Sequence, residues 1–157
     1  MASATATVRH PSRAASGYRR LVVPLSGSAE SERVVELACA LAAEHGATVT
    51  AAFVIEVSPL LPLDARMDEE ELAARAALLR AEAIADAFGV RLHGRTIRAR
   101  EAGRAIVDLV EDTHAELVLV AAARKRRAYS RSALGSTVRH VLAKSPCRVL
   151  IVAPPVE

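Results

Sequence analysis

Gly135, Ser136 and Thr137 begin a short helix-like segment in the part of the sequence best suited to hold an anion. The aliphatic residues 117–120 and 149–152 predict two strands, with a helix over 136–143 between them. A parallel strand followed by a loop and a helix N-terminus brings backbone N–H groups and the positive end of the helix dipole to one point. This pattern predicts a phosphate site, although helix capping by Ser136 explains the same residues equally well.

The loop that leads into this helix is strongly basic. It contains Arg124, Lys125, Arg126 and Arg127, followed by Arg131. These side chains could bind phosphate directly, arginine as a bidentate fork and lysine as a point charge. A charge run of this kind is more commonly a solvated, exposed surface, so the cluster alone does not define a site.

The interior must be built almost wholly from aliphatic side chains. Of the 157 residues, 52% are hydrophobic, but only 3% are aromatic and none is tryptophan. Val, Leu, Ile and Ala suit parallel strands packed beneath alanine-rich helices, whereas base stacking needs exposed aromatic rings. Much of the net charge of +3 lies in the N-terminal tail and the basic loop, so we expect no nucleic-acid partner.

Cysteine and histidine usage indicates neither disulfides nor a metal site. Cys39 and Cys147 occupy apolar positions typical of small buried residues in a reducing compartment, so we expect a cytoplasmic protein. The five histidines are scattered without ligand spacing. No apolar run is long enough to span a membrane, so no membrane partner is expected. Residues 1–17 lack acidic side chains and an apolar stripe, which predicts a disordered tail before a single domain over residues 18–157.

Strand-like and helix-like segments alternate through this domain. Apolar runs predict further strands at 20–25, 47–55 and 90–97. Helical periodicity predicts helices over 29–45 and 68–88 and another after residue 103. Without any hairpin signal, the order indicates an α/β fold: a five-stranded parallel open sheet with helices on both faces. Ligands of such sheets bind beyond the carboxyl ends of the strands, where the strand order reverses.

Three local features carry sharper predictions. Pro24 has no backbone N–H for a ladder, so it should lie at the very end of the first strand. Asp68 and Glu71 resemble a capping box at the start of the helix over 68–88. The apolar faces predicted for the first two helices are Val34, Leu37, Ala38 and Leu41, and then Leu72, Ala76, Leu79 and Ala83.

Three segments of the chain resemble the universal stress protein family. LVVPLSGSAESERVVELACALA (21–42) is similar to its first strand and helix, and EAGRAIVDLVEDTHAELVLV (101–120) to its third helix and fourth strand. LGSTVRHVLAKSPCRVLIV (134–152) resembles its C-terminal signature and is the most specific of the three. The resemblance extends from about residue 18 to residue 153.

The resemblance implies a Rossmann-like fold of the adenine nucleotide alpha hydrolase type, with strand order 3-2-1-4-5. Many members bind ATP or AMP through Gly-x2-Gly-x9-Gly-Ser/Thr. Here Ala122 and Lys125 occupy the first two glycine positions, or Ala121 the first if the strand is one residue longer. Ser26 stands where nucleotide-binding members usually carry Asp. The candidate nucleotide-binding residues are Pro24, Leu25, Ser26, Val54, Ile55, Ala122, Arg124, Lys125, Gly135, Ser136 and Thr137.

Two functions remain open at this point. The first is a stress-response or signalling module that binds an adenine nucleotide weakly, and the second is a dimeric interaction module that binds none. An uncovered edge of Val149, Leu150, Ile151 and Val152 would favour aggregation, so we expect it to pair with a second copy, unless Pro154 and Pro155 blunt the edge instead. No catalytic constellation is recognisable, so no enzyme is predicted, although weak nucleotide hydrolysis stays open.

Overall fold

Strands and helices alternate along the chain in the computed structural model, which describes residues 17–122 and 135–155. The predicted tail, apart from Gly17, and the candidate residues Arg124 and Lys125 lie outside the described residues. The elements are β1 (Arg20–Leu25), α1 (Ala29–His45), β2 (Thr48–Glu56), α2 (Asp68–Phe88), β3 (Arg91–Ala99), α3 (Ala102–Asp112), β4 (Leu117–Ala121), α4 (Ser136–Lys144) and β5 (Arg148–Val152).

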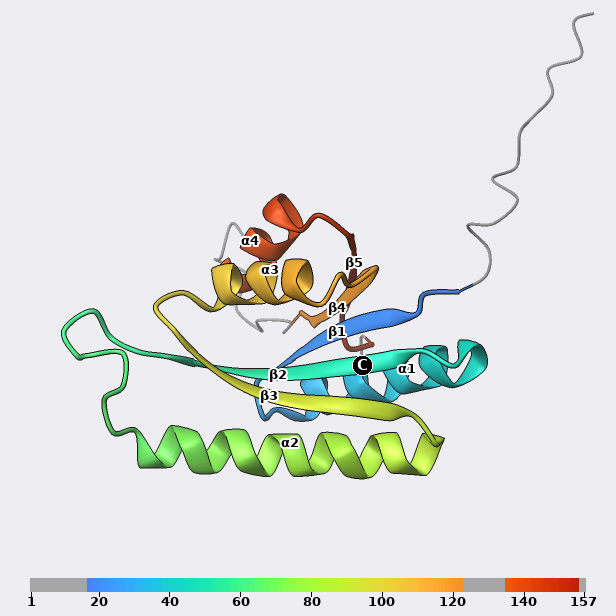
Figure 1. The fold of residues 1–157 in the computed structure, drawn as a ribbon, viewed down its shortest axis with the longest axis horizontal. Coiled ribbons are helices and arrows are strands. Elements are labelled where there is room, and N and C mark those ends of the chain that lie inside the picture. Colours follow the sequence, from blue (N-terminus) through green and yellow to red (C-terminus); the bar gives the residue numbers. More distant parts are fainter. Residues whose placement is uncertain (1–16, 123–134, 156–157) are drawn as a thin grey trace, which may run out of the picture.

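The described strands form one five-stranded sheet in the order β3-β2-β1-β4-β5, and every pairing is parallel. Helices α1 and α2 cover one face of the sheet and α3 and α4 cover the other (Figure 1). The predicted fold class and strand order are therefore confirmed. Because all the strands are parallel, their carboxyl ends meet at one edge, and the strand order reverses there between β1 and β4.

Successive side chains of β1 pack into the hydrophobic clusters on opposite faces of the sheet. Leu21, Val23 and Leu25 belong to the cluster beneath α1 and α2, whereas Val22 belongs to the cluster beneath α3 and α4. Neighbouring residues of a strand point to opposite faces, so a strand covered on both sides must be apolar throughout. Each such side chain contributes about 1.5–3 kcal/mol on burial, which makes this central strand a major source of stability.

Pro24 lies one residue before the end of β1, and not at its very end as predicted. The pairing of β1 with β2 runs on through Pro24 to Leu25, but its pairing with β4 includes only Leu21 and Val22. A proline can be accommodated because it stands beyond the point where the β1–β4 ladder stops. The two strands are thus no longer hydrogen-bonded to each other where they approach the carboxyl edge.

Helix α2 buries a different face from the predicted one. Leu72 and Leu79 are 63% and 60% exposed, and the buried residues are Ala74, Ala77, Ala81 and Ala85. The alanines face the core because their small side chains let α2 lie close to α1 and the sheet. The first helix is similarly shifted, since Leu37 is exposed while Val35, Cys39 and Ala42 are buried together with Val34 and Ala38.

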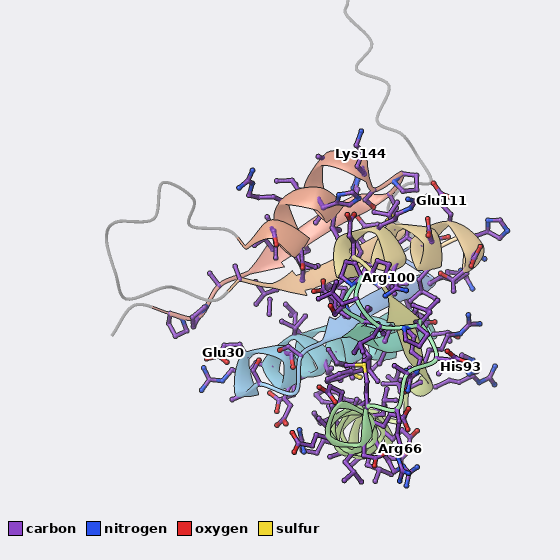
Figure 2. The ribbon with its side chains drawn as sticks, turned by 90° about the vertical axis from the view of Figure 1, so that its left-hand side faces the viewer. Glu30, Arg66, His93, Arg100, Glu111 and Lys144 are labelled. Atoms are coloured by element: carbon purple, nitrogen blue, oxygen red, sulfur yellow. The ribbon has the colours of Figure 1, made fainter. Side chains whose placement is uncertain are left out.

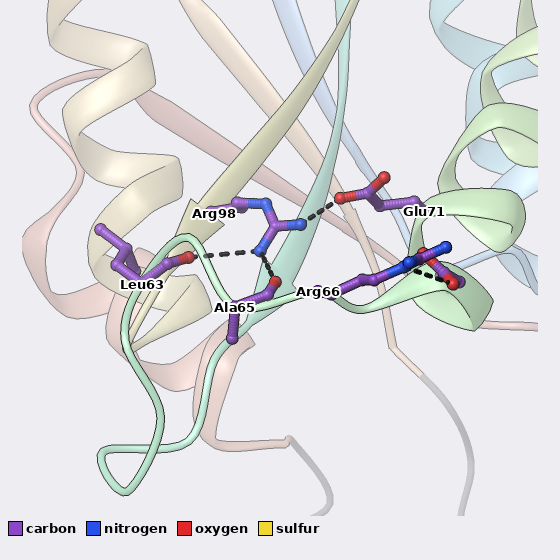
Figure 3. Close-up of polar contacts among 6 residues, drawn as sticks. Leu63, Ala65, Arg66, Glu71 and Arg98 are labelled. Carbon is purple, nitrogen blue, oxygen red and sulfur yellow. Dashed lines mark hydrogen bonds and ion pairs between the residues drawn. The ribbon is translucent and has the colours of Figure 1, made fainter.

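The predicted capping box of α2 is also absent. Met67 is the N-cap residue and makes no side-chain cap hydrogen bond. Asp68 instead pairs with Arg66, and Glu71 pairs with Arg98 from β3 (Figure 3). The acidic first turn of α2 therefore binds arginines and does not cap its own backbone.

Candidate functional site

A pocket of about 470 Å³ opens at the carboxyl edge of the sheet, where the β1–β4 ladder has stopped. Its lining comes from both sides of the strand-order reversal and from the first residues of α3 and α4. The lining residues are Pro24, Leu25, Ser26, Ser31, Phe53, Val54, Glu56, Ala102, Ile106, Val120, Ala121, Thr137 and Val138. Open parallel sheets bind their ligands at this position.

The turn from β1 into α1 forms one wall. Gly27 has a φ of 77°, a left-handed conformation that residues with a side chain adopt at a cost. Ser28 caps α1, because its Oγ accepts from the backbone N–H of Ser31 at 3.2 Å. The Ser26 and Ser28 hydroxyls lie 2.8 Å apart and share a hydrogen bond, so Ser26 can still offer its remaining capacity to a ligand.

The end of β2 forms a second wall through Glu56. Its Oε1 accepts a hydrogen bond from the backbone N–H of Ala102 at 2.8 Å. Ala102 is the first residue of α3, and the N-cap residue Glu101 makes no side-chain cap hydrogen bond. Glu56 therefore caps α3 from another element, which places a carboxylate in the pocket wall.

The N-terminus of α4 forms the third wall. Gly135 is its N-cap residue and has no side chain, and Arg139 N–H donates back to the Gly135 carbonyl at 3.0 Å. The amides of Ser136, Thr137 and Val138 precede this first bond of the helix, so they are not used within it. Ser136 is the first helical residue and not the N-cap residue, which excludes the capping role considered for it above.

The four helix N-termini differ in charge. Helix α1 carries Glu30 and Glu32 in its first turn, α2 carries Asp68 to Glu71, and α3 is capped by Glu56. The first turn of α4 has no acidic residue, while Lys144 complements the negative dipole at its other end. Figure 2 shows Glu30 on α1 and Lys144 on α4, at helix ends where each favours the dipole. The positive end of α4 is the one left without a carboxylate among the described residues.

The structure brings five of the candidate residues together in the lining of this pocket: Pro24, Leu25, Ser26, Val54 and Thr137. Gly135 and Ser136 are exposed and directly precede Thr137 in the chain. Ile55 does not line the pocket, because it is 2% exposed and packs with Val57 and Ala74 on the α2 side.

Ala122 also lies outside the lining, whereas its neighbour Ala121 belongs to it. Ala122 is 6% exposed, and its N–H donates to the carbonyl of Val152 at 2.9 Å. This amide is therefore occupied by the contact with β5. The alternative register with Ala121 at the first motif position agrees better with this placement.

Several lining residues were missed by the sequence reasoning, chiefly Ser31, Phe53 and Glu56. Glu56 carried a usable signal, because it is a charged residue that ends an otherwise uncharged strand. Ser31 and Phe53 had none, since a buried hydroxyl in a helix and an aromatic ring in a strand are both compatible with the core.

A larger hollow of about 590 Å³ lies between β3 and α3. Both acidic and basic side chains line it, and some of them already make hydrogen bonds within the protein. Two of its arginines hold the loop between β2 and α2. Arg98 donates to the carbonyls of Leu63 and Ala65 (Figure 3), and Arg100 donates to those of Val57, Ser58 and Leu61. We therefore regard this hollow as part of the loop's support and place the candidate site in the smaller pocket.

Metal-binding clusters and membrane-spanning helices are both absent from the described residues. No group of three His, Cys, Asp or Glu side chains there is arranged to hold a metal ion. No helix in that part of the chain is both long enough and apolar enough to cross a membrane.

The sheet order and the pocket at its reversal define a Rossmann-like α/β domain. The model of the universal stress protein family matches residues 17–153, so the chain belongs to that family. A universal stress protein of Methanocaldococcus jannaschii is 29% identical over 144 residues, which are 88% of this chain and 84% of that protein.

Solved structures of universal stress proteins share the fold. One in complex with cAMP has a TM-score of 0.67 and 27% identity, over 87% of this chain and 97% of that one. A universal stress protein from Archaeoglobus fulgidus has a TM-score of 0.72 and 24% identity, over 85% and 98% of the two chains. Another structure from that organism, in complex with dAMP, has a TM-score of 0.68 and 22% identity, over 85% and 97%.

Proposed function

We propose that this protein is a stress-response or signalling module that binds an adenine nucleotide, ATP or AMP, in the pocket between β1, β2 and α4. The observation that carries the proposal is the pocket itself, which gathers Pro24, Leu25, Ser26, Val54 and Thr137 at the reversal of strand order. Complexes of family members with cAMP and dAMP support the choice of an adenine nucleotide. Binding, and not catalysis, is the proposed activity.

The shape and lining of the pocket suit a nucleoside. Its volume of about 470 Å³ falls in the range of about 300–1,000 Å³ that is usual for small-molecule sites. Leu25, Phe53, Val54, Ile106 and Val120 supply apolar surface for a base. A purine gains stability on such surface through the hydrophobic effect and dispersion contacts.

The phosphates would lie at the N-terminus of α4. The unused amides of Ser136, Thr137 and Val138 point out of the first turn, and no acidic residue there opposes an anion. Ala122, or Ala121 in the alternative register, and Lys125 stand where the family motif has its first two glycines, so the backbone cannot approach the phosphates as closely. Together with Ser26 in place of Asp, this predicts weak binding, in the micromolar to millimolar range.

A thermal-shift titration tests the proposal. We expect millimolar ATP or AMP to raise the melting temperature by about 2–5 °C, since a ligand that binds only the folded state stabilises it. Mass spectrometry of ligand released by acid from the purified protein should identify the nucleotide. If neither nucleotide raises the melting temperature and no nucleotide is released, the proposal is wrong, and the alternative of an interaction module that binds no nucleotide remains.

Ser136→Asp should abolish the rise, because it places a negative charge where phosphate would lie. Ser136→Ala removes only the hydroxyl and should retain most of the effect. Ser58→Asp adds the same charge on the loop between β2 and α2, outside the pocket lining, and should leave the rise unchanged. If both Asp variants lose the rise in melting temperature equally, the cause is the change in net charge and not a phosphate site at the N-terminus of α4.

We also propose that two copies pair through β5. This edge strand is short and apolar, and Leu150 is 37% exposed while Val149, Ile151 and Val152 are half-buried. A second β5 would supply partners for the unpaired edge. Light scattering after size-exclusion chromatography should give a dimer at micromolar concentration, and Leu150→Lys should give a monomer. Leu60→Lys, at a position 93% exposed on another surface, is the matched control; a monomeric wild type would overturn this proposal.

A further inference from the structure

We propose that Glu56 recognises the ribose hydroxyls of the bound nucleotide and so sets the preference of this pocket for ribonucleotides. This inference rests on the nucleotide-binding function proposed above. Within the described lining of the pocket, Glu56 is the one side chain that carries a formal charge. Its neighbours there are apolar groups, hydroxyls and backbone, so it dominates the electrostatics of its wall.

The carboxylate is held in place by α3. Oε1 accepts the Ala102 N–H at 2.8 Å, and this bond joins residues 46 positions apart in the chain. A carboxylate offers about four acceptor sites, and no further donor to Glu56 is found within residues 17–122 and 135–155. The side chain is thus oriented by one hydrogen bond and keeps acceptor capacity for a ligand.

The chemistry of a carboxylate selects the part of the nucleotide that it can contact. It repels phosphate, and the phosphates are assigned to α4 on another wall. It accepts hydrogen bonds well from hydroxyl groups, and a ribose presents two adjacent ones. In doubly wound sheets that bind dinucleotides, an acidic residue accepts from the ribose in this way, and Glu56 is the last residue of β2.

Glu56 also supplies a carboxylate to the pocket in place of the one that is missing at Ser26. The position after β1 lacks the carboxylate expected of a nucleotide-binding relative, and a serine there offers only one hydroxyl. Leu25 pairs with Phe53 in the parallel ladder, so the ends of β1 and β2 lie side by side. A carboxylate from β2 therefore reaches the same pocket from the neighbouring strand.

The test compares Kd values for ATP, 2′-deoxy-ATP and 3′-deoxy-ATP by isothermal titration calorimetry on the full chain. We expect wild type to bind ATP about tenfold more tightly than at least one deoxy analogue, as for a lost hydrogen bond to a charged group. Glu56→Gln should weaken ATP by about the same factor and remove the preference over that analogue. The amide oxygen of Gln can still accept from Ala102, so α3 should stay capped and the unliganded melting temperature should change little.

Glu101→Gln is the matched control. It removes the same charge at the same end of α3, but Glu101 does not line the pocket, so the ribose preference should persist. If wild type and Glu56→Gln bind ATP and both analogues with the same ratios, the inference is wrong while the proposed function stands. If wild type binds none of the three nucleotides, the proposed function itself is wrong and the inference with it.

Discussion

The two halves of the sheet differ in the length of their strands and in how many residues pair between neighbouring strands. In the first half, β2 and β3 each have nine residues and pair along their whole length, from Thr48 opposite Arg91 to Glu56 opposite Ala99. In the second half, β4 and β5 have five residues each, and β4 is joined to β1 through only two. The first half is thus fully paired, whereas the pocket opens between the halves, where the β1–β4 ladder stops, and the candidate dimer edge lies on β5.

The sheet edges show the same contrast. β3 exposes Arg91, His93 and Arg95, and charged side chains discourage pairing with another chain. β5 carries Val149 to Val152 without such protection beyond Arg148. The difference indicates that the β3 edge is protected against pairing with another chain, whereas the β5 edge lacks this protection. Four experiments compare the two halves of the molecule.

The largest stability effect is expected at the contact between α3 and α4 in the second half. A Cβ added at Gly103 would lie 2.7 Å from the His140 Cβ and 3.0 Å from its Cγ, so one helix must move. Overpacking costs about 1–3 kcal/mol, which exceeds the gain of about 1 kcal/mol in helix propensity. We expect Gly103→Ala to lower the free energy of unfolding by about 1–2 kcal/mol in urea titrations.

Gly94→Ala on β3 is the matched substitution in the first half. Its Cβ would lie 3.1 Å from Leu78 Cδ2, the end of a flexible side chain that can rotate away. We expect a change within about 0.5 kcal/mol of zero. Equal losses in the two variants would mean that the α3–α4 contact is no tighter than the packing on β3.

A smaller effect is expected where β3 supports the β2–α2 loop. Arg98 donates to the Ala65 carbonyl at 2.6 Å and to the Leu63 carbonyl at 3.2 Å, and it pairs with Glu71. Arg98→Ala should lower the free energy of unfolding by about 1 kcal/mol and increase hydrogen exchange across residues 58–67. Arg66→Ala breaks an ion pair whose side chains are 87% and 60% exposed, and it should have almost no effect. Unchanged exchange in Arg98→Ala would show that the loop does not depend on this arginine.

The two cysteines, one in each half, differ in how accessible they are to reagents. Burial raises the pKa of Cys39 to about 11 from an ordinary value of 9.0, while Cys147 is half-buried. A disulfide reagent at pH 8 should therefore label Cys147 in the folded protein and Cys39 only on unfolding. Rapid labelling of Cys39 under native conditions would contradict its burial.

The raised pKa of Cys39 also makes the free energy of unfolding depend on pH. Below pH 9 the thiol is protonated in both states, so its contribution is constant. Between pH 9 and about 11 the unfolded thiol ionises first, so stability should fall as pH rises. Cys39→Ala should remove this component of the slope in urea titrations between pH 8 and 10.5, and an unchanged slope would assign it to other groups.

Local signals predicted the helix and strand boundaries well. Helix α1 begins after Ser28 and ends at Gly46, whose φ of 63° suits a glycine cap; both residues are visible in the sequence as a cap and a stop. The candidate site was predicted in part, because the turn after β1 and the start of α4 are recognisable locally. Glu56 carried a local signal as the charged end of an uncharged strand, but its hydrogen bond to Ala102, 46 residues away, is visible only in the folded structure.

The sequence by itself determined the alternation of strands and helices, the parallel sheet and the ends of most elements. These depend on side-chain periodicity and on caps that act within a few residues. The tertiary structure decided which of two apolar stripes of α2 is buried, since alanines allow a close approach that leucines prevent. It also decided that Val54 faces the pocket while Ile55 faces the α2 side, because a one-residue difference in a strand reverses the face and only packing on both sides fixes it.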